Sequence, residues 1–140
     1  MTPILTSAPL MQCSLPPRFE SDAGVIQNLV ELCRDDGACG VAIIDCKADS
    51  RRSSHYHKTD WHYLYVLSGV MHYTERRYGS GSVVKFTVKE GQLVFTGPRI
   101  EHWTEFPVET RLISVSKLSR RHEEHEGDVV RVPWITDVPT

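Results

Sequence analysis

The sequence predicts an all-β fold, a small barrel or sandwich within one domain. Short runs rich in Val, Ile, Tyr and Phe follow one another closely, and turn residues separate them. No stretch between these runs is long enough for the helices that a parallel α/β fold requires. The chain has 140 residues, 40% of them hydrophobic and 24% charged. This length and composition suit one soluble globular domain with a single core.

The strands are expected mainly after the turn at Asp35-Asp36-Gly37. Before that turn, residues 24–33 (GVIQNLVELC) space their apolar side chains unevenly and fit either a short strand or a single helix. After it, strands are expected in the segments CGVAIIDC, SSHYH, HYLYVLSG, VMHYTERRY, SVVKFTV, QLVFTG, HWTEFP and TRLISVSKL. Glycine, serine and proline interrupt the chain between most of them, as in Gly97-Pro98.

Three regions follow from this pattern. Residues 1–22 contain prolines and small polar residues, so we expect an extended N-terminal arm. Residues 23–120 should form the barrel. Residues 121–140 pass from charged to apolar, which predicts a C-terminal strand or arm. Such ends often cover sheet edges within a dimer, and we therefore expect a homodimer.

Charge and composition narrow the partners. The formal net charge is −2 with acids and bases interspersed, which predicts neither nucleic acid nor membrane as a partner. No basic residue precedes Arg18, so the N-terminus does not resemble a secretory signal, and we expect a cytoplasmic protein. The cysteines lack paired C-x-x-C spacing and are interpreted as reduced, buried thiols: Cys13, Cys33, Cys39 and Cys46.

Histidines carry the chemical signal. His55 and His57 lie two apart, so on a strand both project to one face. His62 follows a polar interruption that suits a turn onto the next strand, and the hairpin after Gly97-Pro98 can return His102 towards the first pair. Imidazole is the commonest protein ligand for zinc, copper, iron and nickel. His72, His122 and His125 are interpreted as strand or surface residues.

These two segments resemble the two sequence motifs of the cupin superfamily. HYHKTDWHYLYVLSG is similar to the first motif, with His62 where the family usually has glutamate, and GQLVFTGPRIEH is similar to the second. The resemblance implies a double-stranded β-helix, or jelly-roll barrel. It also implies one divalent transition metal (zinc, nickel, manganese or iron) held by four ligands: His55, His57, His62 and His102. Replacing the carboxylate by imidazole removes a negative charge and weakens the case for the usual iron oxygenase.

Strand alternation suggests which other side chains face the metal. Leu64 and Val66 should point inward with His62, and Thr104 and Phe106 with His102. On strand 70–78, Tyr73 and Glu75 share a face and form a candidate catalytic acid/base pair if that face is the inner one. Trp61, Trp103 and Phe106 are candidate walls of the pocket.

The predicted function is therefore metal-dependent chemistry next to a carbonyl. We expect an isomerase, epimerase or cyclase whose partner is a small carbonyl-bearing substrate. A wider resemblance to stand-alone bacterial cupins of sugar-nucleotide and surface-polysaccharide pathways makes sugar derivatives candidates. Two alternatives are an Fe(II)-dependent dioxygenase and a non-catalytic metal- or ligand-binding cupin, and the orientation of Tyr73, Glu75 and Glu105 should discriminate between catalysis and binding.

Overall fold

A computed structural model describes residues 18–31, 40–77, 82–118 and 126–135, and the side chains of 28–31 are not part of the description. Several residues discussed above lie outside these ranges, namely Cys13, Cys33, Cys39, His122 and His125. Within them, no helix is long and apolar enough to cross a membrane.

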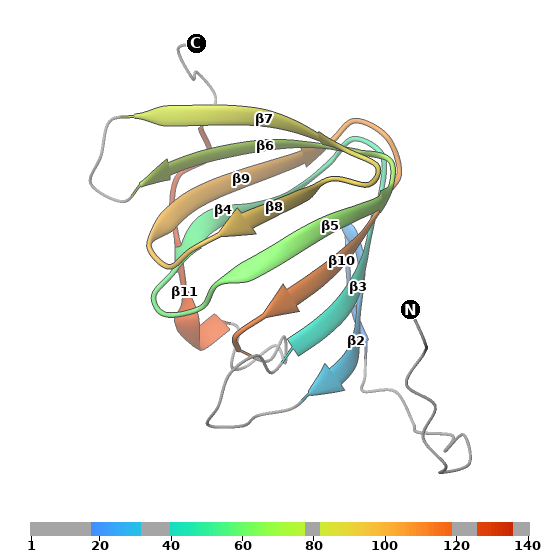
Figure 1. The fold of residues 1–140 in the computed structure, drawn as a ribbon, viewed down its shortest axis with the longest axis horizontal. Helices are drawn as coiled ribbons and strands as arrows, with labels where there is room; N and C mark the ends of the chain where they lie inside the picture. The colour runs from blue at the N-terminus through green and yellow to red at the C-terminus, as the bar shows by residue number, and fades with distance from the viewer. Residues whose placement is uncertain (1–17, 32–39, 78–81, 119–125, 136–140) are drawn as a thin grey trace, which may run out of the picture.

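The described chain is almost entirely β-strand and forms the predicted jelly roll. Two antiparallel sheets stack face to face (Figure 1), with strand orders β1-β2-β3-β10-β5-β8 and β11-β4-β9-β6-β7. The strands are β1 Phe19–Ser21, β2 Gly24–Glu31, β3 Gly40–Cys46, β4 Ser50–His57, β5 His62–Ser68, β6 Val70–Arg77, β7 Val83–Lys89, β8 Leu93–Thr96, β9 Ile100–Phe106, β10 Thr110–Ser116 and β11 Val129–Arg131.

The ambiguous segment at residues 24–33 is a strand over Gly24–Glu31, so the helical alternative is wrong for this part. Its uneven apolar spacing accompanies a register irregularity between Asn28 and Val30, where β2 pairs with β3. A bulge of this kind breaks strict alternation without ending the strand. Sheet pairing, which a single segment does not reveal, decides its conformation.

Both ends of the described chain are built into sheet edges. Phe19–Ser21, at the end of the predicted N-terminal arm, pairs with β2 as an edge strand. Val129–Arg131, in the predicted C-terminal segment, pairs with residues 55–57 of β4, which include two of the candidate ligands. This C-terminal segment therefore contacts the strand on which the site depends.

The core lies between the two sheets. β3 and β5 alternate buried and more exposed side chains, as expected of strands with one face covered. The central cluster of buried side chains comprises Ile44, Cys46, Leu64, Val66, Met71, Tyr73, Val88, Val94, Phe106 and Leu112. The predicted inward direction of Leu64, Val66 and Phe106 is thus confirmed.

A β-bulge interrupts β4 just before the first histidine. Ser53 pairs with Trp103 and His55 pairs with His102, so Ser54 is an extra residue without a partner in the register. Ser53 and Ser54 have φ values of 75° and 63°, which non-glycine residues rarely adopt. The inserted residue shifts the phase of alternation, so that Arg52 and His55, three apart, both project into the barrel.

Candidate metal centre

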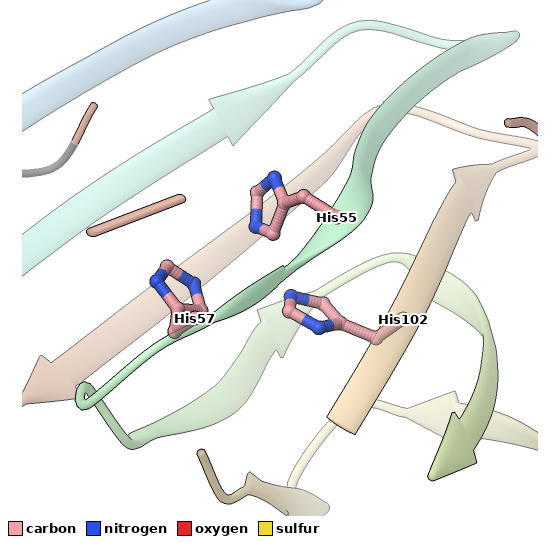
Figure 2. A group of neighbouring side chains, drawn as sticks. All are labelled: His55, His57 and His102. Atoms are coloured by element: carbon pink, nitrogen blue, oxygen red, sulfur yellow. The ribbon is translucent and has the colours of Figure 1, made fainter. Parts of the chain in front are cut away.

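Three imidazoles converge inside the barrel from two neighbouring strands. His55 and His57 project from β4, and His102 projects from β9 towards them (Figure 2). One ring nitrogen from each forms a group in which all atoms lie within 4.8 Å of one another. The residues are only 7%, 1% and 1% exposed. The cross-strand pairing of His55 with His102 explains the convergence, because directly opposed residues project to the same face.

His62 approaches the same point from the opposite sheet. It is the first residue of β5 and is buried. Its ring centroid lies 5.3 Å from that of His102 and 5.4 Å from that of His57. All four predicted ligands therefore face the interior, and the close group of nitrogens comes from His55, His57 and His102. The participation of His62 as a fourth ligand stays a prediction.

The donor set fits a divalent transition metal. Ligand nitrogens about 2.1 Å from a tetrahedral ion lie about 3.4 Å apart, so nitrogens within 4.8 Å need only small side-chain rotations to bind one. Buried imidazoles are typical ligands for zinc, nickel and iron in proteins, three of the four metals expected from the family resemblance.

A buried carboxylate, that of Asp128, lies next to one histidine of the triad. Asp128 Oδ2 lies 3.5 Å from His57 Nδ1, and both residues are largely buried. Asp128 is itself fixed by Thr59, whose backbone N–H and hydroxyl donate to Oδ1, and by the Asp60 N–H, which donates to Oδ2. A carboxylate at one ring nitrogen orients a ligating histidine and raises its basicity. Asp128 was not predicted from the sequence, because most of the barrel strands lie between it and His57 along the chain.

Tyr73 and Glu75 lie on the interior face of β6, as a catalytic role requires. Tyr73 is buried, its hydroxyl is 2.7 Å from the Thr96 hydroxyl, and its ring stacks at 6.3 Å from the His102 ring. Glu75 is the cross-strand partner of His102. Burial raises the pKa of Tyr73, against the lowering effect of its hydrogen bond with Thr96, and burial also raises the pKa of Glu75.

The other candidate residues on β6 and β9 lie on both faces of their sheet, some towards the interior and some away from it. Phe106 lines the interior cavity, as expected. Trp103 is buried on the opposite face of β9, where its indole N–H donates to the Pro133 carbonyl, and it is not among the residues lining that cavity. Glu105 is exposed, and so is His72. The covering of Trp103 by residues after β11 explains how an outward-facing aromatic becomes buried.

A small cavity of about 90 Å³ lies beside the triad. Its walls include His55, His57 and His62, several apolar core side chains, and Arg52. Arg52, Ser53, His55 and Ile26 also line an outer pocket of about 360 Å³, so the two spaces adjoin at these residues. Arg52 is a second residue that the sequence analysis missed, because simple alternation places it on the outside of the strand.

Cys46 lies next to this arginine. Burial raises the pKa of the Cys46 thiol to about 11, with the nearby charge of Arg52 and a hydrogen bond to it acting in the opposite direction. The thiol is therefore protonated at neutral pH. This agrees with the interpretation of Cys46 as a buried thiol.

Solved structures place the fold among known proteins, whereas no protein-family model and no curated protein sequence matches the chain. The capsular polysaccharide assembling protein CapF from Staphylococcus aureus superposes with a TM-score of 0.74 at 16% identity, over 88% of this chain and 33% of that one. A variant of the oxalate decarboxylase from Bacillus subtilis gives 0.68 at 16% identity, over 83% and 30%. A CENP-C domain from Drosophila melanogaster gives 0.60 at 12% identity, over 73% and 72%. This chain thus spans about a third of CapF.

Proposed function

We propose that this chain, which has the cupin fold, is a metal-dependent enzyme that isomerises, epimerises or cyclises a small carbonyl-bearing compound. The observation that carries the proposal is the buried triad of His55, His57 and His102 with an adjoining cavity. A divalent transition metal bound there would act as a Lewis acid towards a carbonyl oxygen.

The chain's own residues would handle the proton. The carboxylate of Glu75, opposite His102, is suited to remove a proton from the carbon next to a carbonyl and to return it, because its raised pKa brings it nearer to neutrality. Tyr73 keeps its proton at neutral pH and can act as a donor. The buried surroundings of Tyr73 strengthen its interactions by excluding water.

Sugar derivatives are among the substrates that this proposal includes. The name of CapF, a capsular polysaccharide assembling protein, supports that class, although the likeness itself concerns the fold. Movement of a proton next to a carbonyl is one of the steps by which sugars are isomerised and epimerised. The proposal therefore extends from small keto compounds to sugar-derived ones.

A non-catalytic binding role is the second candidate, and one observation favours it. Neither Tyr73 nor Glu75 is among the residues that line the cavity beside the histidines, and Glu75 instead lines a cleft between β7 and β8. Drosophila CENP-C, a fold neighbour, was solved bound to CAL1. A protein that binds metal but does not exchange the C–H protons of small keto compounds would favour this candidate.

Two measurements test the proposal. Elemental analysis of protein purified without a metal-affinity tag should find about one divalent metal per chain. The metal should be lost in His102→Ala and retained in His72→Ala, a matched variant at an exposed histidine. Proton NMR in D₂O should then detect exchange of C–H for C–D in a panel of small keto acids, hydroxyketones and keto sugars. Glu75→Gln should abolish that exchange without loss of metal.

The other outcomes contradict the proposal in distinct ways. Oxygen consumption by the iron form, with no deuterium exchange, would establish the dioxygenase alternative. Bound metal without exchange or oxygen consumption would leave the binding candidate. If His102→Ala keeps its metal, the metal is not bound by the triad of His55, His57 and His102.

A further inference from the structure

An arginine lies on the inner surface of the barrel, close to the histidines. The bulge at Ser53-Ser54 turns Arg52 inward, and its cross-strand partner is the buried Thr104, whose hydroxyl donates to the Arg52 carbonyl. The pairing and this hydrogen bond hold the backbone at Arg52. Two unfavourable φ values are retained in a segment whose effect is to aim an arginine into the cavity.

One edge of the Arg52 guanidinium is buried. Its Nε and Nη2 atoms are buried and have no hydrogen-bond partner within the part of the chain that the structure describes. These two groups point in the same direction and match the two oxygens of a carboxylate. A buried polar group without a partner is costly, so a site of this kind favours a ligand that supplies the missing acceptors.

The acidic side chains near Arg52 already form ion pairs with other arginines. Asp45, which precedes Cys46, accepts hydrogen bonds from Arg111, and Glu126, which lines the outer pocket with Arg52, accepts them from Arg131. Arg51, the adjacent arginine on β4, lies over the ring of Trp134. Among the described residues, no ion pair is formed by Arg52. The positive charge of Arg52 is therefore available to a ligand.

From these observations we propose that Arg52 binds the carboxylate of a small keto or hydroxy acid whose other end lies at the histidine triad. This inference rests on the proposed function and narrows its substrate to small carboxylic acids. Arg52 lines both the inner cavity and the outer pocket, so it lies on the path by which a ligand would reach His55. Apart from Arg52 and the histidines, the walls of the inner cavity are mainly apolar, including Ile44, Leu64 and Leu112. They suit a singly charged carboxylate better than a doubly charged phosphate.

Calorimetric titration of metal-loaded protein with pyruvate tests the inference without requiring turnover. Pyruvate should bind, whereas pyruvamide, which keeps the carbonyl and lacks the charge, should bind at least about tenfold more weakly. Arg52→Gln should weaken pyruvate binding by about tenfold or more and leave the metal content unchanged. Arg77→Gln, at an exposed arginine of β6 that lines neither the inner cavity nor the outer pocket, should bind pyruvate as the unmodified protein does.

A third variant, Arg52→Lys, separates the charge of the side chain from its paired N–H groups. It keeps the charge but not the paired N–H edge, and it should bind pyruvate with intermediate affinity. Circular dichroism and thermal unfolding of each variant establish that it is folded. Equal binding of pyruvate in Arg52→Gln and the unmodified protein would overturn the inference, as would equal binding of pyruvamide. Tighter Arg52-dependent binding of inorganic phosphate would overturn the choice of carboxylate. Binding of pyruvate is measured without turnover, so it does not depend on the deuterium exchange described above. A protein that binds pyruvate through Arg52 but catalyses no exchange would contradict the proposed catalysis and not the proposed binding site.

Discussion

At the scale of single residues, the contact between Asp128 and His57 should contribute to metal affinity. Asp128→Asn keeps the size of the side chain and removes the negative charge beside His57 Nδ1. We expect metal affinity to fall by about 10- to 100-fold, the usual effect of losing a carboxylate that orients a ligating histidine. Competition with a chromogenic chelator measures that affinity.

The neighbouring carboxylate provides the control. Glu126 lies two residues away and forms an ion pair with Arg131, so Glu126→Gln removes a charge from the same segment without touching the histidine. Its metal affinity should match that of the unmodified protein. Equal affinities in all three proteins would show that Asp128 only anchors the loop through Thr59 and Asp60.

Individual site residues were predictable to different degrees. Alternation places His55 and His57 on one face of a strand, and the family resemblance made that face the interior and added His62 and His102. Arg52 was missed because the inserted Ser54 reverses the alternation, and the sequence carries no glycine there to signal a bulge. Asp128 was missed because its neighbour His57 is brought to it only by the pairing of β11 with β4.

At the scale of elements, the hairpin between β5 and β6 turns at Gly69, which has a φ of +96°. A Cβ atom there would lie 2.4 Å from Thr110 Oγ1 and 2.5 Å from the Glu109 carbonyl oxygen. We expect Gly69→Ala to lower the free energy of unfolding by about 3 kcal/mol or more, through both the clash and the unfavourable φ. Urea denaturation followed by circular dichroism measures this loss.

Gly91→Ala is the matched control for that variant. Gly91 has a φ of +82°, and an added Cβ would meet nothing within 4 Å. Gly91→Ala should lower the free energy of unfolding by only about 1–2 kcal/mol, the conformational cost of a left-handed residue other than glycine. Similar losses in the two variants would show that the contact with Thr110 does not contribute.

The elements themselves follow closely from the sequence. The expected segments from residue 39 to residue 118 correspond to strands β3 to β10, because turn residues mark most of their ends. Residues 24–33 were ambiguous because their apolar spacing is compatible with two periods, and hydrogen bonds with β3 decide between them. The stacking of the two sheets depends on contacts distant in sequence, and the family resemblance supplied it where local pattern did not.

At the scale of the whole molecule, the outer face of the larger sheet exposes apolar side chains in register. Tyr63 pairs with Phe95 and Tyr65 with Leu93, and these residues are 39%, 50%, 37% and 57% exposed. Together they present roughly 400 Å² of surface, about half of what one partner buries in a stable dimer. The half-buried Ile113 and Val115 extend this face onto β10.

We expect a second copy of the chain to cover this face, because a flat sheet face can pair with itself about a two-fold axis. Light scattering coupled to size-exclusion chromatography should give twice the 15.9 kDa of one chain. Phe95→Lys should shift the mass towards the monomer, whereas Val108→Lys, at an exposed apolar residue outside this face, should not. A monomeric mass for the unmodified protein would refute the expectation.

The pairing of β11 with β4 also bears on the order in which the molecule is completed on the ribosome. The strands that carry the histidines are synthesised first, and the segment holding Asp128 and Val129–Arg131 emerges later. Until that segment emerges, the outer edge of β4 is unpaired and His57 lacks its carboxylate neighbour. If the proposed metal binds at the histidines, its capture at full affinity would therefore come late in biogenesis, with the docking of a short C-terminal strand.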